Sequence, residues 1–163
     1  MTERLRLREM TDGDLDAMAT LLGDPEVMRH YPRPKTREEA SGWIQWNKRN
    51  YVERGFGLWI VETTSGEFVG DCGLTMQKVD GVEDVEVGYH VRAELQGRGY
   101  ATEAAAACRD HAAAVGVRRL IAIIAPGNRP SQRVAEKIGL TFERHGRSHE
   151  RDVVVYAATL PVE

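Results

Sequence analysis

Residues 86–107 read EVGYHVRAELQGRGYATEAAAA, and this stretch decides the predicted fold. Over Val85–Val91 apolar and polar residues alternate as in a β-strand, whereas the alanines after the glycines recur at steps of three and four over Ala101–Val115. The change of period to about 3.6 predicts a helix with a narrow face of small residues, which can lie close to a sheet. The apolar run Leu120–Ala125 predicts a buried strand beside Val85–Val91, so the three segments form a βαβ unit.

The segments before this unit predict two helices followed by strands. Thr11 is a candidate cap for the first helix, and the pair Thr36 and Glu39 has the capping-box spacing that begins a second helix. Turns that contain glycine separate the strand-like runs, which predicts that the runs pair as an antiparallel meander. The runs are Leu58–Thr63, Phe68–Thr75 and Val85–Val91.

The segments after the unit predict one more helix and the end of the sheet. Asn128 follows the strand, Val134–Ile138 has the apolar spacing of a helix, and Gly139 stops that helix. Phe142 and the run Val153–Leu160 then complete the sheet. The predicted class is α/β, with a mixed, partly antiparallel central sheet flanked by helices.

Length and composition narrow the class of protein. With 163 residues, of which 42% are hydrophobic, the chain fits one domain over residues 1–163. The net charge of -3 and the pI near 6.0 lack the basic excess typical of nucleic-acid binders, so we expect no nucleic-acid partner. No apolar run has the roughly 20 residues that span a bilayer, and MTERLRLREM lacks the apolar core of a signal peptide. We therefore expect a cytoplasmic protein without a membrane partner, and the sequence leaves its oligomeric state open.

The two cysteines do not indicate a metal or disulfide site. Cys72 and Cys108 lie in unrelated sequence contexts, and neither has a further ligand at metal-binding spacing. We therefore expect buried thiols and no metal.

The glycine junction between strand and helix suits an anion. Gly97 and Gly99 precede a predicted helix start, where main-chain N–H groups gather at the positive end of the helix dipole. A phosphate can approach because glycine carries no side chain there, although the same glycines also fit a plain tight turn. The stretch lacks the Gly-Lys-Ser/Thr of a P-loop and the third small residue of a dinucleotide fingerprint, so those two phosphate-binding motifs fit poorly.

Motifs at and beyond this junction resemble the GNAT superfamily of N-acetyltransferases. Gln96–Ala101 reads QGRGYA and is similar to its Q/R-x-x-G-x-G/A signature, and it follows a Glu-Val-Gly-Tyr strand. Further segments resemble the ribosomal-protein alanine acetyltransferase branch, so the resemblance covers nearly the whole chain. These segments are Asn128–Ser131, Glu136–Leu140, Arg4–Arg8 and Asp24–Met28.

The resemblance implies a GNAT-like domain that binds acetyl-CoA as the acetyl donor. It implies that the pyrophosphate lies on the N–H groups of Gly97–Thr102 and the pantetheine along Tyr89–Arg92. It also implies that Asn128 holds the pantetheine arm, although Asn128 equally fits the N-cap of the following helix. The cofactor-binding residues so implied are Tyr89, His90, Val91, Arg92, Gln96, Gly97, Arg98, Gly99, Tyr100, Ala101, Thr102, Asn128 and Ser131.

Glu86 and Ser131 are the candidate catalytic residues. An amine attacks only when unprotonated, and Glu86 shares a strand face with Gly88 and His90, where its carboxylate can accept a proton. A structural ion pair fits Glu86 equally well, and His90 or Asp71 are alternative bases. The resemblance places Ser131 near the sulfur, where its hydroxyl can protonate the leaving thiolate.

We expect direct transfer of acetyl to a primary amine in a ternary complex, because neither cysteine lies at the junction where a covalent acyl carrier is expected. The branch resemblance suggests a protein N-terminal α-amine as acceptor, and a polyamine, an amino acid or an aminoglycoside-like amine stays open. Acceptor-binding loops are expected at His30–Thr36 and Thr75–Asp84. The alternative from another class of protein is a non-catalytic acyl-CoA-binding sensor with the same cofactor site.

Overall fold

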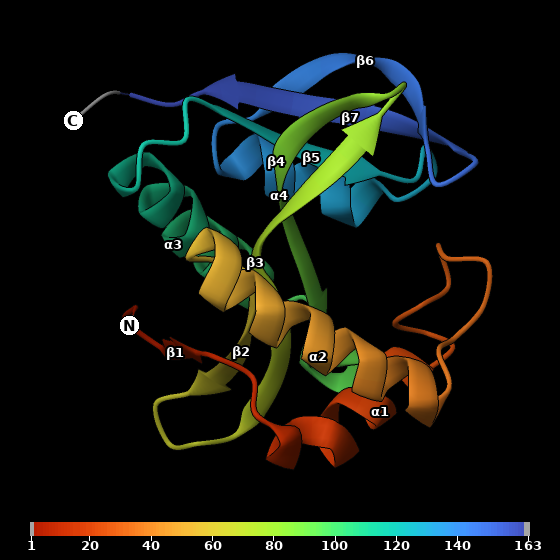
Figure 1. Ribbon diagram of the computed structural model, residues 1–163, viewed down its shortest axis with the longest axis vertical. Coiled ribbons are helices and arrows are strands. Elements are labelled where there is room, and N and C mark those ends of the chain that lie inside the picture. Colours follow the sequence, from red (N-terminus) through yellow and green to blue (C-terminus); the bar gives the residue numbers. More distant parts are fainter. Residues whose placement is uncertain (1, 162–163) are drawn as a thin grey trace.

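An open seven-stranded sheet with four α-helices forms over residues 2–161, which are the residues that the computed structural model describes (Figure 1). The strands are β1 (Leu5–Arg8), β2 (Leu58–Thr63), β3 (Phe68–Val79), β4 (Val82–Val91), β5 (Arg119–Ile124), β6 (Thr141–Ser148) and β7 (Arg151–Thr159). The helices are α1 (Leu15–Gly23), α2 (Arg37–Arg54), α3 (Tyr100–Ala114) and α4 (Arg129–Lys137). The strand order is β1-β2-β3-β4-β5-β7-β6, and among these strands β4 and β5 alone pair in parallel. The predicted α/β class with a mixed, partly antiparallel sheet is confirmed.

The predicted βαβ unit is confirmed as β4, α3 and β5, but the sheet ends differently from expectation. β7 pairs with β5 on one side and with β6 on the other. The sequence predicted the run Val153–Leu160 but only Phe142 of β6, because β6 reads TFERHGRS and is mostly polar. A strand at the sheet edge needs no continuous apolar pattern, and its charged side chains protect the open edge from further pairing.

The two faces of the sheet pack against different helices. Leu58 and Ile60 of β2 pack with residues of α1 and α2. Val61, one position further on, belongs to the cluster that contains Ala104 of α3 and Ala135 of α4. In Figure 1, α2 lies in front of the sheet and α3 passes behind it. Because successive side chains of a strand alternate between faces, each site residue on β4 has a defined face.

Two threonines mark the starts of the first helical segments. Thr11 caps a 3-10 turn at Asp12–Asp14 that runs into α1, so the predicted first helix begins as a tighter turn. Thr36 Oγ1 accepts the N–H of Glu39 at 3.1 Å, and Glu39 Oε1 accepts the N–H of Thr36 at 2.9 Å. The predicted capping box of α2 is therefore confirmed, and it fixes one end of the segment 24–36 between α1 and α2.

β3 and β4 form a longer hairpin than the sequence predicted. The two strands stay paired up to Val79 and Val82, where Asp80 and Gly81 make the turn with φ of 50° and 80°. Positive φ at both central residues matches the right-handed twist of the flanking strands. The expected acceptor-binding loop at Thr75–Asp84 is therefore wrong, because most of that segment is paired strand.

Cys72 on β3 and Cys108 on α3 are buried thiols, as predicted, and they lie against each other. Their sulfur atoms are 3.6 Å apart. The hydrogen bond with Cys108, together with burial, raises the pKa of the Cys72 thiol. This thiol therefore stays protonated at neutral pH and packs as a small apolar side chain.

Gly73 lets β3 approach the chain that enters β2, because a Cβ there would lie 2.0 Å from the carbonyl oxygen of Gly57. We expect Gly73→Ala to lower the free energy of unfolding by at least about 1 kcal/mol, since overpacking forces the backbone to shift. Gly42→Ala is the matched control, because a Cβ on Gly42 within α2 meets nothing within 4 Å. The control should raise stability in urea unfolding by about 0.4–1 kcal/mol. Equal destabilisation of both variants would contradict the close approach at Gly73.

Candidate active site

The parallel strands β4 and β5 part at the centre of the sheet. They pair at Val85 with Leu120 and at Glu86 with Ile121, and β4 then continues to Val91. Figure 1 shows β4 turning away from β5 beyond this point. One main-chain edge of β4 after Glu86 therefore faces an opening in the sheet rather than a neighbouring strand.

Glu86 lies where the opening begins. Its Oε2 accepts a hydrogen bond from the main-chain N–H of Ile123 on β5, 3.3 Å away. Burial raises the pKa of Glu86 to about 7, although that N–H, the charge of His90 and the hydroxyl of Thr75 oppose the rise. A carboxyl group with this pKa exchanges its proton near neutral pH, as a general base must. Gly88 shares the face, as expected, because a Cβ on it would lie 3.7 Å from Glu86 Oε1.

Tyr89 and Ser131 form a hydroxyl pair on the face opposite Glu86. Ser131 Oγ donates to Tyr89 Oη at 3.0 Å, and Tyr89 Oη donates to the main-chain oxygen of Ser131 at 2.8 Å. Burial raises the pKa of Tyr89, so its hydroxyl stays protonated at neutral pH. The sequence predicted Tyr89 as a cofactor contact but not its pairing with Ser131, because no sequence signal shows that β4 meets the first turn of α4.

Asn128 is the N-cap of α4. Its Oδ1 accepts the main-chain N–H of Ser131 at 3.3 Å, so the capping alternative is the one that the structure shows. The cap fixes Ser131 in the first turn of the helix, next to Tyr89. A contact between Asn128 and pantetheine stays a prediction.

The end of β4 has main-chain hydrogen-bonding groups on its open side. Arg92 N donates to Val69 O of β3 at 2.9 Å. Because alternate residues of a strand bond to the same neighbour, the main-chain groups of Tyr89 and Val91 point toward the opening. The side-chain amide of Gln96 donates to Val91 O at 3.0 Å. This edge suits an extended ligand with amide groups that pairs as a strand does.

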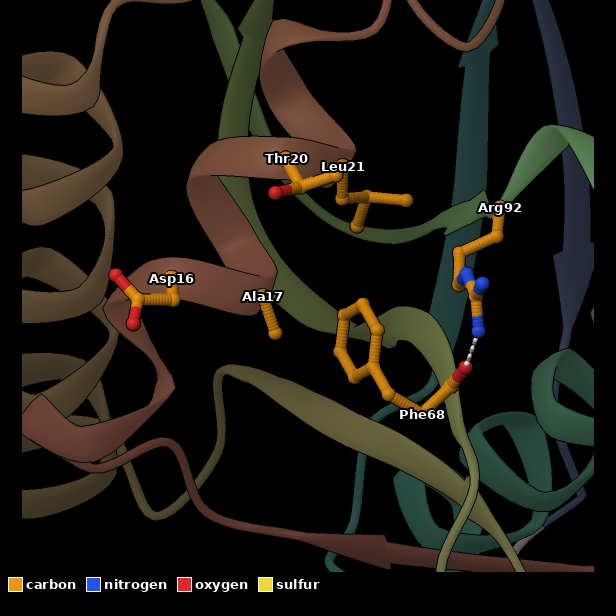
Figure 2. Close-up of a pocket in the computed structure, with 6 residues that line it drawn as sticks. All are labelled: Asp16, Ala17, Thr20, Leu21, Phe68 and Arg92. Atoms are coloured by element: carbon orange, nitrogen blue, oxygen red, sulfur yellow. Dashed lines mark hydrogen bonds between the residues drawn. The ribbon is translucent and has the colours of Figure 1, made fainter.

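The side chain of Arg92 turns away from this edge. Figure 2 shows its guanidinium pointing to the main-chain oxygen of Phe68, to which it donates at 2.9 Å. It also pairs with Glu94 at 3.2 Å. Arg92 and Phe68 border a cavity of about 280 Å³ beside α1, whose lining includes neither Glu86 nor Ser131. The main-chain groups of Arg92 are bonded as well, because Arg92 O accepts from Leu95 N at 2.9 Å, so a contact of Arg92 with a cofactor stays a prediction.

The glycine junction has backbone angles that favour glycine. Gly97 and Gly99 have φ of 80° and 82°, in the left-handed region, so their conformation as well as the space for a phosphate explains the residue type. Glu103 N donates to Gly99 O at 3.0 Å. The N–H groups of Tyr100–Thr102 therefore precede the first helical hydrogen bond, at the positive end of the α3 dipole. This arrangement suits an anion.

Arg4 holds the glycine junction in place, a contact that no sequence pattern predicted. Its guanidinium donates to Arg98 O at 3.0 Å and pairs with Glu103 at 2.7 Å. The guanidinium carbon also lies 4.7 Å from the centre of the Tyr100 ring. Arg4 therefore ties the chain before β1 to the start of α3, a contact between segments far apart in the sequence.

The side chain of His90 contacts residues on the same face of the sheet as itself. Its Nδ1 lies 2.8 Å from Asp71 Oδ1 on β3, and its Nε2 lies 2.8 Å from the hydroxyl of Tyr31. Asp71 also accepts the N–H of Trp43 at 3.1 Å, and its side chain is 0% exposed. A substrate therefore has no direct access to Asp71. The main chain of His90 faces β3, as that of Arg92 does, so a cofactor contact of His90 stays a prediction.

Within residues 2–161, no group of three or more His, Cys, Asp or Glu side chains is placed to hold a metal ion. In the same part of the chain, no helix combines the length and the apolar character that crossing a membrane requires.

Comparison with known proteins identifies similar chains. The family model described as the acetyltransferase (GNAT) domain matches residues 4–141. The protein YkkB of Bacillus subtilis is 40% identical over 164 residues, which cover 96% of this chain and 92% of YkkB. An acetyltransferase structure from Agrobacterium tumefaciens has 30% sequence identity and a TM-score of 0.84, covering 97% of this chain and 92% of that one.

A more distant structure shows the same fold with coenzyme A bound. It is the ribosomal-protein acetyltransferase RimL, with a TM-score of 0.77 and 20% identity over 98% of this chain and 96% of that one. At this identity the likeness concerns the fold alone.

The raised pKa of Glu86 makes stability depend on pH. The folded chain holds this proton up to about pH 7, whereas the unfolded chain releases it near the ordinary carboxyl pKa of 4.5. The stability contributed by Glu86 is therefore full below that ordinary value and is lost as the pH rises through about 7. We expect Glu86→Gln to lack this dependence on pH. As the pH increases toward 7, its free energy of unfolding relative to that of wild type should therefore rise by up to about 1.4 kcal/mol per pH unit.

Urea unfolding of wild type and variant between about pH 5 and about pH 7 measures this difference. Glu83→Gln is the matched control, because Glu83 is an exposed glutamate of the same strand. Parallel stability curves for wild type and Glu86→Gln would contradict a protonated, buried Glu86.

Proposed function

The chain belongs to the acetyltransferase (GNAT) family, and we propose that it transfers an acetyl group from acetyl-CoA to a primary amine. The amine attacks the thioester directly in a ternary complex. One observation carries this proposal, namely the opening between β4 and β5. It has a carboxylate of raised pKa, Glu86, on one face and the hydroxyl pair of Tyr89 and Ser131 on the other.

The cofactor follows the main-chain groups that line the opening. Its pyrophosphate lies on the N–H groups at Gly97–Thr102, where the helix dipole favours negative charge. Its pantetheine arm pairs with the open edge of β4 at Tyr89 and Val91 and reaches the side chain of Asn128. The positive end of α3 and the unpaired edge of β4 support this placement, because one is suited to phosphate and the other to amide groups.

The reaction needs a base on the amine and an acid on the sulfur. Glu86 accepts a proton from the acceptor ammonium, and the free amine then forms an N–C bond with the thioester carbon. The C–S bond breaks, and the thiolate takes the Ser131 hydroxyl proton while Ser131 takes the hydroxyl proton of Tyr89, which water restores as CoA leaves. The buried, protonated Cys72 supports direct transfer, because such a thiol is a poor acyl carrier.

The acceptor that we place first is a protein N-terminal α-amine. The segments Asn128–Ser131 and Glu136–Leu140 support it, because they resemble acetyltransferases of that class. The segment 24–36 and the β6–β7 hairpin are its candidate binding elements, and they meet where Arg151 Nη1 donates to His30 O at 2.9 Å. Polyamines, amino acids and aminoglycoside-like amines are the alternative acceptors.

Binding and turnover of acetyl-CoA test the proposal. Acetyl-CoA at about 100 times its Kd should stabilise the folded chain by about 2.7 kcal/mol, seen as a rise in Tm, whereas NAD and ATP should do much less. Release of CoA is then followed with a peptide that begins with alanine, spermidine, glycine and kanamycin as acceptors. No thermal shift and no heat of binding with acetyl-CoA would contradict the cofactor site. Binding without CoA release from any acceptor would favour the sensor alternative.

Glu86→Gln and Ser131→Ala separate the base from the acid. Glu86→Gln should lower turnover about 10²- to 10⁴-fold, and the defect should shrink as the pH approaches the pKa of the amine. Ser131→Ala should lower turnover less, because a thiolate whose thiol has a pKa of about 8.5 leaves without much help. Rate profiles against pH for both variants provide the measurement. Wild-type rates for Glu86→Gln at every pH would leave Glu86 with a structural role only.

A further inference from the structure

A chain of hydrogen bonds connects the segment between α1 and α2 to the interior of the sheet. The Tyr31 hydroxyl lies 2.8 Å from His90 Nε2, and His90 Nδ1 lies 2.8 Å from Asp71 Oδ1. Trp43 Nε1 donates to the second oxygen of Asp71 at 3.1 Å. His90 and Asp71 are buried, whereas Tyr31 exposes 44% of its surface. The chain therefore runs from a residue at the surface to a buried carboxylate.

The bonds of Asp71 fix the hydrogens along this chain. An ionised carboxylate only accepts hydrogen bonds, so His90 Nδ1 carries a hydrogen and Nε2 keeps its lone pair. The Tyr31 hydroxyl then donates to Nε2, and its own lone pairs stay available to another donor. Although 44% of the Tyr31 residue is exposed, its hydroxyl end is buried, and this burial, followed by the charges of Glu86 and Asp71, raises the pKa of Tyr31, so the hydroxyl is protonated at neutral pH.

Tyr31 lies close to the opening between β4 and β5. Its hydroxyl is bonded to His90, which shares the β4 face of Glu86, and the charge of Glu86 contributes to the raised pKa of Tyr31. Arg151 on β7 donates to the main-chain oxygen of His30 at 2.9 Å and so ties the segment that carries Tyr31 to the sheet. The Tyr31 hydroxyl is therefore held on the acceptor side of the proposed transfer site.

The proposed reaction has one more proton to move than Glu86 can accept. An alkyl amine arrives mostly as an ammonium ion, and its nitrogen loses two protons on the way to an amide. The first leaves before attack and goes to Glu86. The second leaves as the N–C bond forms and the nitrogen becomes positively charged, so it needs another acceptor.

We propose that Tyr31, His90 and Asp71 form a proton relay that takes up this second proton, an inference that rests on the proposed acetyl transfer. The attacking nitrogen gives its proton to the Tyr31 oxygen while the Tyr31 hydroxyl proton passes to His90 Nε2. The imidazolium so formed is stabilised by the Asp71 carboxylate, which holds the ring without touching the substrate. After the product leaves, the proton returns through Tyr31 to water. Tyr31 is then a catalytic residue and Asp71 a positioning residue.

Charged and titratable groups from several elements face this relay and influence its pH dependence. Lys35 lies over the ring of Trp43, with Nζ 5.2 Å from the ring centre. The others are Glu86 and Tyr89 on β4 and Arg151 on β7. The steps of a measured pH profile are therefore assigned to residues by comparing the profiles of variants with that of wild type, and not from one profile alone.

Tyr31→Phe tests the relay because it keeps the ring, whose centre is 5.5 Å from that of His90, and removes the hydroxyl. The acceptor is the alanine peptide, or the most active amine of the same panel. We expect kcat to fall about 10²-fold with an unchanged Kd for acetyl-CoA. At low pH, log kcat of wild type should fall with a slope of about two, because Glu86 and the relay must each be free to accept a proton. Tyr31→Phe should show a slope of about one, because the relay no longer reaches the substrate.

Tyr51→Phe is the matched control. The Tyr51 hydroxyl also has two partners, since it donates to Leu58 O and accepts from Met10 N, but both lie outside the proposed site. This variant should lose stability and keep the wild-type kcat and slope. A fall in kcat from general loosening of the fold would appear in both tyrosine variants.

Asp71→Asn tests the positioning role. In this variant the amide oxygen must accept from Trp43, so the amide NH₂ faces His90 Nδ1. The ring hydrogen therefore moves from Nδ1 to Nε2. Nε2 can then no longer accept the hydrogen of the Tyr31 hydroxyl. Nitrogen NMR of labelled histidine should report this change of tautomer, with a fall in kcat similar to that of Tyr31→Phe. An unchanged tautomer or a wild-type kcat in this variant would overturn the role of Asp71.

The outcomes separate the relay from the proposed function. An active Tyr31→Phe enzyme with the wild-type kcat and the wild-type low-pH slope would overturn the relay and leave acetyl transfer intact. Lack of turnover by the wild type on the whole panel, despite acetyl-CoA binding, would instead overturn the proposed function, and the relay with it.

Discussion

The parting of β4 and β5 is the constraint on which the rest of the structure depends. β4 is held along its length by β3, and β5 is held by β7, so the sheet consists of two well-paired parts joined at Val85 and Glu86. Main-chain groups inside a sheet need partners. The carboxylate of Glu86 accepts from Ile123, and the amide of Gln96 donates to Val91. The remaining groups on this edge are left for a ligand, and that is why the site lies at the centre of the sheet.

The alternation of a strand divides the chemistry between the two faces. Glu86 and His90 are separated by an even number of positions and lie on the face that packs against α1 and α2. Tyr89 lies on the opposite face with α3 and α4, where it meets Ser131. The groups suited to taking protons from an amine are therefore on one side of the opening, and the hydroxyls suited to a leaving thiolate are on the other. One short strand keeps the two sets apart without any loop.

Short sequence patterns predicted the helices and strands at the centre of the sheet and the face on which Glu86 lies. The period change around Gly97 and Gly99 predicted the βαβ unit, and the strand alternation predicted the face of Glu86. The remaining contacts join segments far apart in the sequence, and no periodicity reports such contacts. They include Arg4 on the glycine junction, Tyr89 on Ser131, and the chain from Tyr31 to Asp71. The polar edge strand β6 was missed for a different reason, because an exposed edge carries little apolar signal.

The elements proposed to face the acceptor are tied to each other, and the segment 24–36 is also tied to β4 through the hydrogen bond between Tyr31 and His90. The turn of the β6–β7 hairpin places His149 and Glu150 at φ of 50° and 63°, a conformation that non-glycine residues rarely adopt. Contacts on both sides hold it, since Ser148 donates to Lys78 O at 2.7 Å and Arg151 donates to His30 O at 2.9 Å. Changes in this hairpin would therefore alter the acceptor that fits while β4 and the start of α3 keep their geometry. In the proposed reaction the hairpin acts on the choice of acceptor alone, whereas the segment 24–36 acts on the acceptor and, through Tyr31, on the transfer step.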